Sequence, residues 1–145
     1  MICSITPDLD AIGFKFGIAY DSPFGHRGFS HSIVFAALLA SCLSLFAQLI
    51  KASRLAVWFF VLFSTLSHGM LDAMTNGGLG VAFFSPLSET RYFLPFQFIQ
   101  VSPIGIRNFL TAKSIAVLQS EFLFIWLPCL IIFSAARLHK TPNKH

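Results

Sequence analysis

The chain has 145 residues, of which 55% are hydrophobic and only 11% are charged. Average soluble domains carry about a quarter charged residues, so this composition excludes a typical water-soluble domain and a disordered chain. The net charge is +4, but the ten lysines and arginines are scattered, which argues against a nucleic-acid partner. The length predicts one domain, residues 1–145, and the three widely separated cysteines indicate no disulfide framework.

The first apolar run predicts a membrane-spanning helix over residues 33–50. No charged residue occurs between Arg27 and Lys51, and about 20 apolar residues suffice to cross a bilayer as a helix. Ser30 or Ser32 is expected to cap the start of this helix.

The second run predicts a span over residues 55–73 that lies antiparallel to the first. Only four residues, from Lys51 to Arg54, separate the two runs, and so short a connection makes consecutive helices neighbours. A third run, residues 114–136, contains one acid and one proline and predicts a third span.

The segment between the second and third runs, residues 73–113, is rich in glycine and proline, which break regular helices. We expect an irregular, partly buried loop there. The predicted fold class is therefore all-α: a multi-pass membrane helical bundle of about three spans with one long Gly/Pro-rich loop.

Imidazole and carboxylate side chains gather at one end of the predicted helix pair. Antiparallel helices bring the start of the first span and the end of the second to the same membrane face. The N-terminal acids are expected on that face as well. The candidate metal ligands are Asp8, Asp10, His26, His31, His68 and Asp72.

The spacing of these residues supports a shared site. His68 and Asp72 are four apart, so their side chains lie on one face of a helix. Asp8 and Asp10 are two apart, and on an extended segment after Pro7 they would point the same way. Imidazole together with carboxylate matches a divalent metal, zinc first and manganese second.

Four segments together resemble a family of bacterial inner-membrane metal-dependent hydrolases, often described as LexA-regulated. The segments are PDLD, HRGFSHS, LSHGMLDAMTNGG and FFSPLSETRYFLP, and the resemblance covers about residues 5–103. It implies a multi-pass protein of the bacterial inner membrane whose hydrolase site is distantly similar to zinc-dependent phospholipase C and nuclease P1. The matching positions are Asp8, Asp10, His26, Arg27, His31, Ser32, His68, Asp72, Thr75, Arg91 and Pro95.

Two positions depart from the family pattern. Only six residues precede Pro7, where family members commonly carry a further apolar segment with another histidine. Asn76 stands where a proline usually follows the threonine. These departures predict a chain with one ligand and one helix fewer than its relatives.

The hypothesis that follows is hydrolysis of a phosphoester or a lipid-linked ester by metal-activated water. His31, His68 and Asp72, with Asp8 or Asp10, are expected to bind one or two divalent ions. The remaining N-terminal carboxylate would act as general base, and Arg27 would neutralise developing negative charge. Ser32 and Thr75 would orient the ligands. Partners would be membrane lipid and a small-molecule or lipid-linked substrate, with the oligomeric state open.

The alternative is a non-enzymatic membrane protein whose His/Asp cluster binds or passes a divalent cation or locks helix packing. A packing lock predicts that His68 and Asp72 bond each other while Asp8 points to water. The metal-centre hypothesis instead predicts that His31, His68, Asp72 and an N-terminal aspartate converge at near-contact distances.

Overall fold

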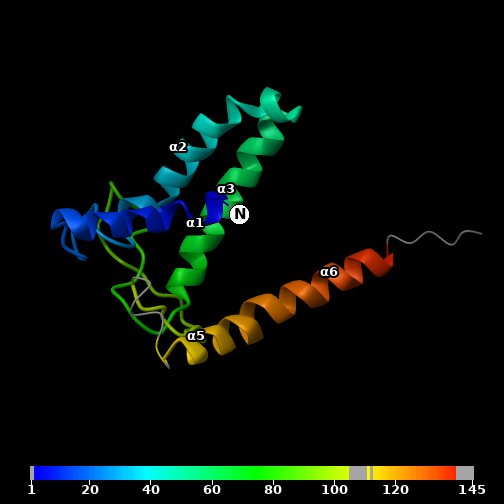
Figure 1. Ribbon diagram of the computed structural model, residues 1–145. Helices are drawn as coiled ribbons and strands as arrows, with labels where there is room; N and C mark the ends of the chain where they lie inside the picture. The colour runs from blue at the N-terminus through cyan, green and yellow to red at the C-terminus, as the bar shows by residue number, and fades with distance from the viewer. Residues whose placement is uncertain (1, 105–110, 112, 140–145) are drawn as a thin grey trace, which may run out of the picture. The chain divides into compact units, whose positions relative to one another are not determined.

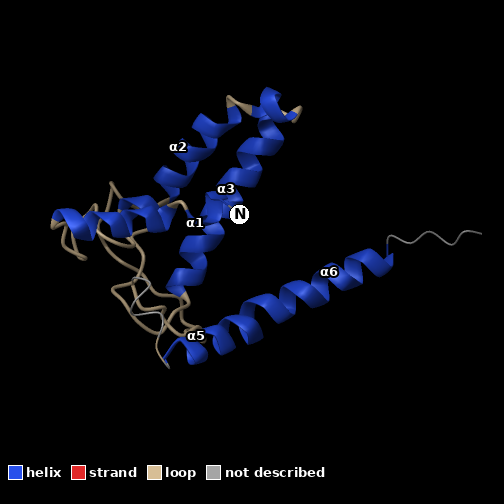
Figure 2. Cartoon of the chain, viewed as in Figure 1, coloured by secondary structure: helices blue, strands red, loops and turns tan. Residues whose placement is uncertain are grey.

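The computed structural model describes residues 2–104, 111 and 113–139. In this part of the chain every regular element is a helix, and Val81 and Tyr92 form an isolated antiparallel β-bridge (Figure 2). The predicted all-α class is confirmed. The chain divides into two compact units, Met1–Gln97 and Phe98–His145.

The first unit is built around an antiparallel helix pair (Figure 1). Near the turn of the pair, Trp58 Nε1 donates a hydrogen bond to Ser41 Oγ at 3.1 Å. At the other end, Gly69 packs closely against the carbonyl of His31. In chain order the elements are α1 (Ile2–Ile5), η1 (Pro7–Phe16), η2 (Phe29–His31), α2 (Ile33–Ser44), η3 (Ala47–Ile50) and α3 (Arg54–Ala73), where η1, η2 and η3 are 3₁₀ helices.

The second expected span corresponds to α3, a 20-residue helix that is long and apolar enough to cross a membrane. The first expected span, residues 33–50, differs from the prediction because α2 ends at Ser44. The hydroxyls of Ser41 and Ser44 donate to backbone carbonyls one turn back, a contact that competes with the helical ladder. The rest of the apolar run forms a turn and the separate helix η3.

The start of α2 is fixed by Ser32, which is buried and serves as the N-cap. Its Oγ accepts a hydrogen bond from the Phe35 backbone N–H at 3.0 Å. Of the two serines proposed for this role in the sequence, the structure selects the second.

Ser32→Ala is expected to lower the free energy of unfolding by about 1 kcal/mol, because one N–H of the first turn loses its acceptor. Chemical unfolding in detergent micelles, followed by circular dichroism, measures the difference. Ser67→Ala is the control, since Ser67 is exposed and bonds only within its own helix turn. Equal losses in the two variants would contradict the capping role.

Residues 74–97 are irregular, as the Gly/Pro-rich composition predicts, but they are tied to the helix ends. The Ala82 N–H donates to the carbonyl of Arg27, and the Ile33 N–H donates to the carbonyl of Phe83, each at 3.0 Å. The Leu94 N–H donates to the carbonyl of Ala73 at 2.8 Å. The loop therefore covers the end of the helix pair where the candidate ligands lie.

The second unit contains one long helix composed of α5 (Lys113–Glu121), the π-helical turn η4 (Phe122–Trp126) and α6 (Leu127–His139). From Ser114 to His139 it is also long and apolar enough to span a membrane, against a predicted span of 114–136. Pro128 has no N–H and its ring crowds the carbonyl four residues earlier, which accounts for the wider turn just before it.

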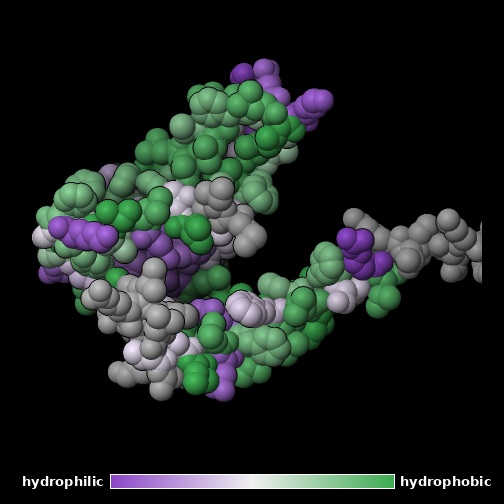
Figure 3. Space-filling view, in the orientation of Figure 1, coloured by the Kyte–Doolittle hydropathy of each residue, from purple (hydrophilic) through white to green (hydrophobic). Residues whose placement is uncertain are grey.

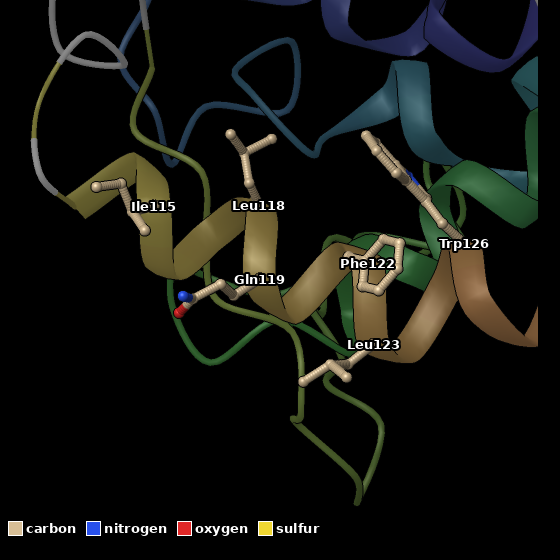
Figure 4. Close-up of a pocket in the computed structure, with 6 residues that line it drawn as sticks. All are labelled: Ile115, Leu118, Gln119, Phe122, Leu123 and Trp126. Carbon is tan, nitrogen blue, oxygen red and sulfur yellow. The ribbon is translucent and has the colours of Figure 1, made fainter.

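Apolar side chains dominate the surfaces of these helices. Figure 3 shows hydrophobic surface over the α2–α3 pair. On α5 and η4, the side chains in Figure 4 line an open apolar hollow: Ile115, Leu118, Gln119, Phe122, Leu123 and Trp126. Such surfaces suit contact with lipid more than contact with water.

Candidate metal centre

Two histidines and two aspartates from three separate elements meet at the end of the helix pair. Asp8 lies on η1, His31 ends η2, and His68 and Asp72 lie on the last turns of α3. One ligand atom from each lies within 4.8 Å of all the others. The convergence predicted from antiparallel helices is therefore present, and we call these residues the four-residue cluster.

Four of the six donor-to-donor spacings inside the four-residue cluster agree with a tetrahedral site. His31 Nε2 lies 3.1 Å from Asp72 Oδ2 and 3.5 Å from Asp8 Oδ1. His68 Nε2 lies 3.2 Å from Asp8 Oδ1 and 3.5 Å from Asp72 Oδ2. In a tetrahedral zinc site with metal–ligand distances of about 2.0–2.1 Å, neighbouring donor atoms lie about 3.3 Å apart. Four edges of the cluster thus have the length that such a site requires.

Two atoms of the cluster lack hydrogen bonds although they are buried. His31 Nε2 and Asp72 Oδ2 are 3.1 Å apart, yet neither makes a hydrogen bond of acceptable geometry. A buried polar atom without a partner is costly, so its persistence needs an explanation. A cation bound between the two atoms would satisfy both.

The cluster is open to the outside on one side. The Asp8 side chain is 49% exposed, whereas the side chains of His68 and Asp72 are largely covered and that of His31 is fully covered. A water molecule or a substrate oxygen can therefore approach past Asp8.

Asp8 and Asp10 do not lie on an extended segment, so the expectation that they point the same way is wrong. They lie on η1, where a 3₁₀ helix turns by about 120° per residue and separates positions two apart. Asp8 faces Nε2 of His31, while Asp10 Oδ2 lies 3.2 Å from Nδ1 of the same ring. The two carboxylates therefore flank His31 from its two nitrogens.

Asp10 also fixes the loop that precedes α2. Its Oδ1 contacts His26 Nδ1 at 2.7 Å, and its Oδ2 accepts hydrogen bonds from Ser30 Oγ and from the Arg27 backbone N–H. Asp10, His26 and His31 form a second group whose donor atoms are close enough to bind an ion. Since one neutral imidazole offers one lone pair, His31 cannot ligate ions through both nitrogens at once.

The charges in this region are balanced by contact between the histidines and the aspartates. Burial opposes protonation of His31, but its interactions with Asp10, Asp72 and Asp8 outweigh burial and raise its pKa to about 10. Burial likewise opposes ionisation of Asp8 and Asp10. Favourable interactions with His31 and with His68 or His26 outweigh it and keep both carboxyl pKa values well below their usual range. The carboxylates thus create a site that favours positive charge at His31.

Arg27 lies behind Asp72 and not on the open side. It is only 3% exposed, and its guanidinium donates to Asp72 Oδ1 at 3.1 Å and to Thr75 Oγ1 at 2.9 Å. A further bond at 2.9 Å reaches the carbonyl of Gly77. The backbone of Arg27 is in the left-handed region, with φ of 63°. Arg27 therefore holds one oxygen of Asp72 by a hydrogen bond, while the other oxygen faces the cluster.

The two hydroxyl residues predicted to orient ligands occupy different places. Thr75 is buried, donates to the carbonyl of Asp72 at 2.7 Å and accepts the bond from Arg27. It connects the arginine to the end of α3. Ser32 is used for the N-cap of α2, and the hydrogen bonds described for it do not reach the cluster.

Arg91 and Tyr20 support the site, and the sequence reasoning did not assign them this role. Arg91 donates to the backbone carbonyls of His26, Tyr20 and Ser22 at 2.9–3.2 Å. The Tyr20 ring meets His26 edge-on, and a side chain at Gly78 would collide with both Tyr20 and Arg27. The sequence feature that could have indicated this role is a single arginine in an aromatic, proline-containing loop. The sequence pattern does not reveal which backbone carbonyls that arginine binds.

The observation that separates the two sequence hypotheses concerns Asp8. In a packing lock, His68 would bond Asp72 and Asp8 would face water. Instead, His68 Nε2 makes its hydrogen bond with Asp8 Oδ1 at 3.2 Å and lies 3.5 Å from Asp72 without a hydrogen bond. The geometry favours a centre on which all four side chains converge.

Comparisons with known proteins give the family. The sequence profile of the YdjM inner membrane protein family matches residues 1–141. The inner membrane protein YbcI of Escherichia coli (strain K12) is 39% identical over 133 residues, which are 91% of this chain and 77% of that protein. No solved structure shows a significant match. The chain belongs to the YdjM family of inner membrane proteins.

Proposed function

We propose that the chain is a membrane-bound, metal-dependent hydrolase that acts on a phosphoester or a lipid-linked ester. The observation that carries the proposal is the set of four donor atoms at 3.1–3.5 Å, two of them buried without hydrogen bonds. An inner-membrane family and two helices of spanning length support a multi-pass protein whose substrate is reached from the bilayer.

His31, His68 and Asp72 would hold the ion and leave the fourth position of a tetrahedral site, beside Asp8, to water, and zinc fits a mixed imidazole and carboxylate set best. When bound, zinc supplies a water whose pKa falls from 15.7 to about 7. The remaining chemistry is that of the protein's own side chains.

Asp8 is the residue placed to accept a proton. Its carboxylate lies at the open side of the cluster, and only Oδ1 faces the two histidines. The second oxygen is then available to a water molecule that approaches from outside, which is the requirement for a general base. Asp10, in contrast, is turned towards His26 and Nδ1 of His31.

Arg27 and Asp10 are positioning residues in this proposal. Arg27 fixes Oδ1 of Asp72 and leaves Oδ2 directed at the cluster. Asp10 Oδ2 lies 3.2 Å from Nδ1 of His31, and its negative charge favours the ring proton on Nδ1 and so the lone pair on Nε2. The role of Arg27 as a partner for negative charge on the substrate has no support in these contacts.

Asp10→Asn is expected to weaken zinc binding by about 10–100-fold, the usual effect of losing a carboxylate that orients a ligating histidine. Competition with a fluorescent zinc chelator measures the affinity. Asp21→Asn is the matched control, since Asp21 is exposed on the following loop. Unchanged affinity in Asp10→Asn would remove Asp10 from the orienting role.

The proposed function is tested by metal content and turnover measured on the same purified protein. Wild-type protein in detergent should retain about one equivalent of zinc for one four-ligand site. It should also hydrolyse bis(4-nitrophenyl) phosphate or a short-chain phospholipid. His68→Ala should lose both properties, whereas His139→Ala, outside the site on α6, should keep both.

Two outcomes would contradict the proposal. Equal zinc content in wild type and His68→Ala would remove His68 from the site. Zinc binding that depends on His68 but gives no turnover with any phosphoester or carboxylic ester probe would identify a cation-binding membrane protein instead.

A further inference from the structure

We propose that the outer side of η1 lies in the bilayer at headgroup level, so that the helix carrying Asp8 and Asp10 is also a membrane-surface anchor. This inference concerns an interaction surface and goes beyond the proposed function. It depends on α3 crossing the bilayer and not on hydrolysis.

The inner sides of η1 are already occupied. Asp8 and Asp10 contact the histidines, Pro7 is buried, and Phe14 stacks near Tyr20 and His26. Every third residue of a 3₁₀ helix lies on the same line, so the remaining side is the stripe formed by Leu9, Ile12 and Lys15.

This stripe is apolar and uncovered in the first unit. Leu9 is 60% exposed and Ile12 is 52% exposed, and Phe16, which ends the helix, is 79% exposed. Three large apolar side chains on one 10-residue helix would be unfavourable in water. Figure 1 shows η1, in dark blue, extending from α1 to one side of the α2–α3 pair.

The depth of η1 follows from its contacts with α3. A helix of 20 residues extends about 30 Å, which equals the hydrocarbon thickness of a bilayer. His68 lies five residues before the end of α3, about 8 Å along its axis, and Asp72 lies in the last turn. Because Asp8 contacts His68 at 3.2 Å, η1 lies where hydrocarbon gives way to headgroups.

The positive charge of the stripe indicates that its partner is a lipid surface. Lys15 is exposed and follows Leu9 and Ile12 on the same line. A lysine beside apolar side chains can reach phosphate groups while its stem and neighbours contact acyl chains. A helix with this arrangement fits the surface of a bilayer that contains anionic phospholipid.

The test is the collision accessibility of a nitroxide label in vesicles of zwitterionic and anionic phospholipid. Single cysteines replace Leu9 or Ile12, the two apolar residues of the stripe, in full-length protein whose three native cysteines are changed to alanine. The oxygen-to-nickel-chelate collision ratio should be several-fold higher at both positions than at Lys51, the exposed residue of the helix-pair turn. A label at Met70, exposed on α3, gives the lipid reference.

Two results would overturn the proposal. Ratios at Leu9 and Ile12 equal to that at Lys51 would place the stripe in water. Dipolar broadening between labels at Ile12 would show that a second copy of the chain covers the stripe. Because neither readout depends on turnover or zinc, failure here is distinguishable from failure of the proposed hydrolase.

Discussion

His31→Ala is expected to abolish zinc binding and turnover and also to destabilise the metal-free protein. The ring lies between Asp8, Asp10 and Asp72, and all three aspartates contact one of its nitrogens. Removing a direct ligand should weaken zinc binding by more than the about 10–100-fold that follows loss of an orienting partner. Leaving buried carboxylates without their cationic partner should cost about 3–5 kcal/mol.

The loss of stability in His31→Ala should depend on pH in a defined direction. The pKa values of Asp8 and Asp10 are lowered in the folded wild-type protein, so their contribution to stability is present above the unfolded carboxyl pKa of about 4 and disappears as pH falls below it. The raised pKa of His31 adds stability that is complete below its unfolded pKa of about 6.5 and is lost as pH rises towards 10. Wild type and variant should therefore differ most between about pH 4 and 6.5 and progressively less in stronger acid. Chemical unfolding in micelles between pH 3 and pH 7, with zinc chelated, measures the difference, whereas a constant difference would contradict the electrostatic explanation.

The helix pair and the meeting of its ligands could be predicted from the sequence because both depend on simple rules. A long uncharged run with a four-residue connection specifies two antiparallel helices. The i, i+4 spacing of His68 and Asp72 then places both side chains on one face of α3, and the antiparallel arrangement brings His31 to the same end.

The form of the N-terminal segment could not be predicted, because tertiary contacts stabilise it. PDLDAIGFKF has no helical periodicity strong enough to identify η1, and its bonds to His26 and His31 come from residues 16 or more positions later. Alternation at positions 8 and 10 suggested a strand-like segment. The expected arrangement is a pair of carboxylates pointing the same way. In the structure, Asp8 and Asp10 instead face the two different nitrogens of the His31 ring.

The end of α2 and the direction of the Arg27 side chain also lie beyond sequence patterns. Hydropathy does not distinguish residues 33–44 from residues 45–50. The structure nevertheless ends α2 at Ser44, where serine hydroxyls donate hydrogen bonds to carbonyls of the preceding turn. An arginine beside a histidine suggests contact with substrate. Its actual direction depends on a left-handed backbone at residue 27 and on the acceptors supplied by Asp72, Thr75 and Gly77.

Arg27→Lys is expected to destabilise the protein nearly as much as Arg27→Ala, by about 3–5 kcal/mol in the alanine variant, because a buried ion pair loses one partner. The guanidinium binds three acceptors in a planar fork, and a lysine ammonium cannot reproduce that arrangement. Unfolding in micelles gives the stability. Arg54→Ala, at the exposed start of α3, is the control and should change stability by less than about 0.5 kcal/mol.

The same variants separate positioning from binding of substrate charge. If Arg27 positions Asp72, zinc affinity should fall in Arg27→Lys, since Asp72 Oδ1 loses its fixed partner while Oδ2 remains in the cluster. If Arg27 instead neutralised the substrate, zinc affinity would stay unchanged and only KM and kcat would respond. Zinc affinity measured by chelator competition, without any substrate, therefore decides between the two roles. An unaltered zinc affinity in Arg27→Lys would show that Arg27 acts on the substrate and does not position Asp72.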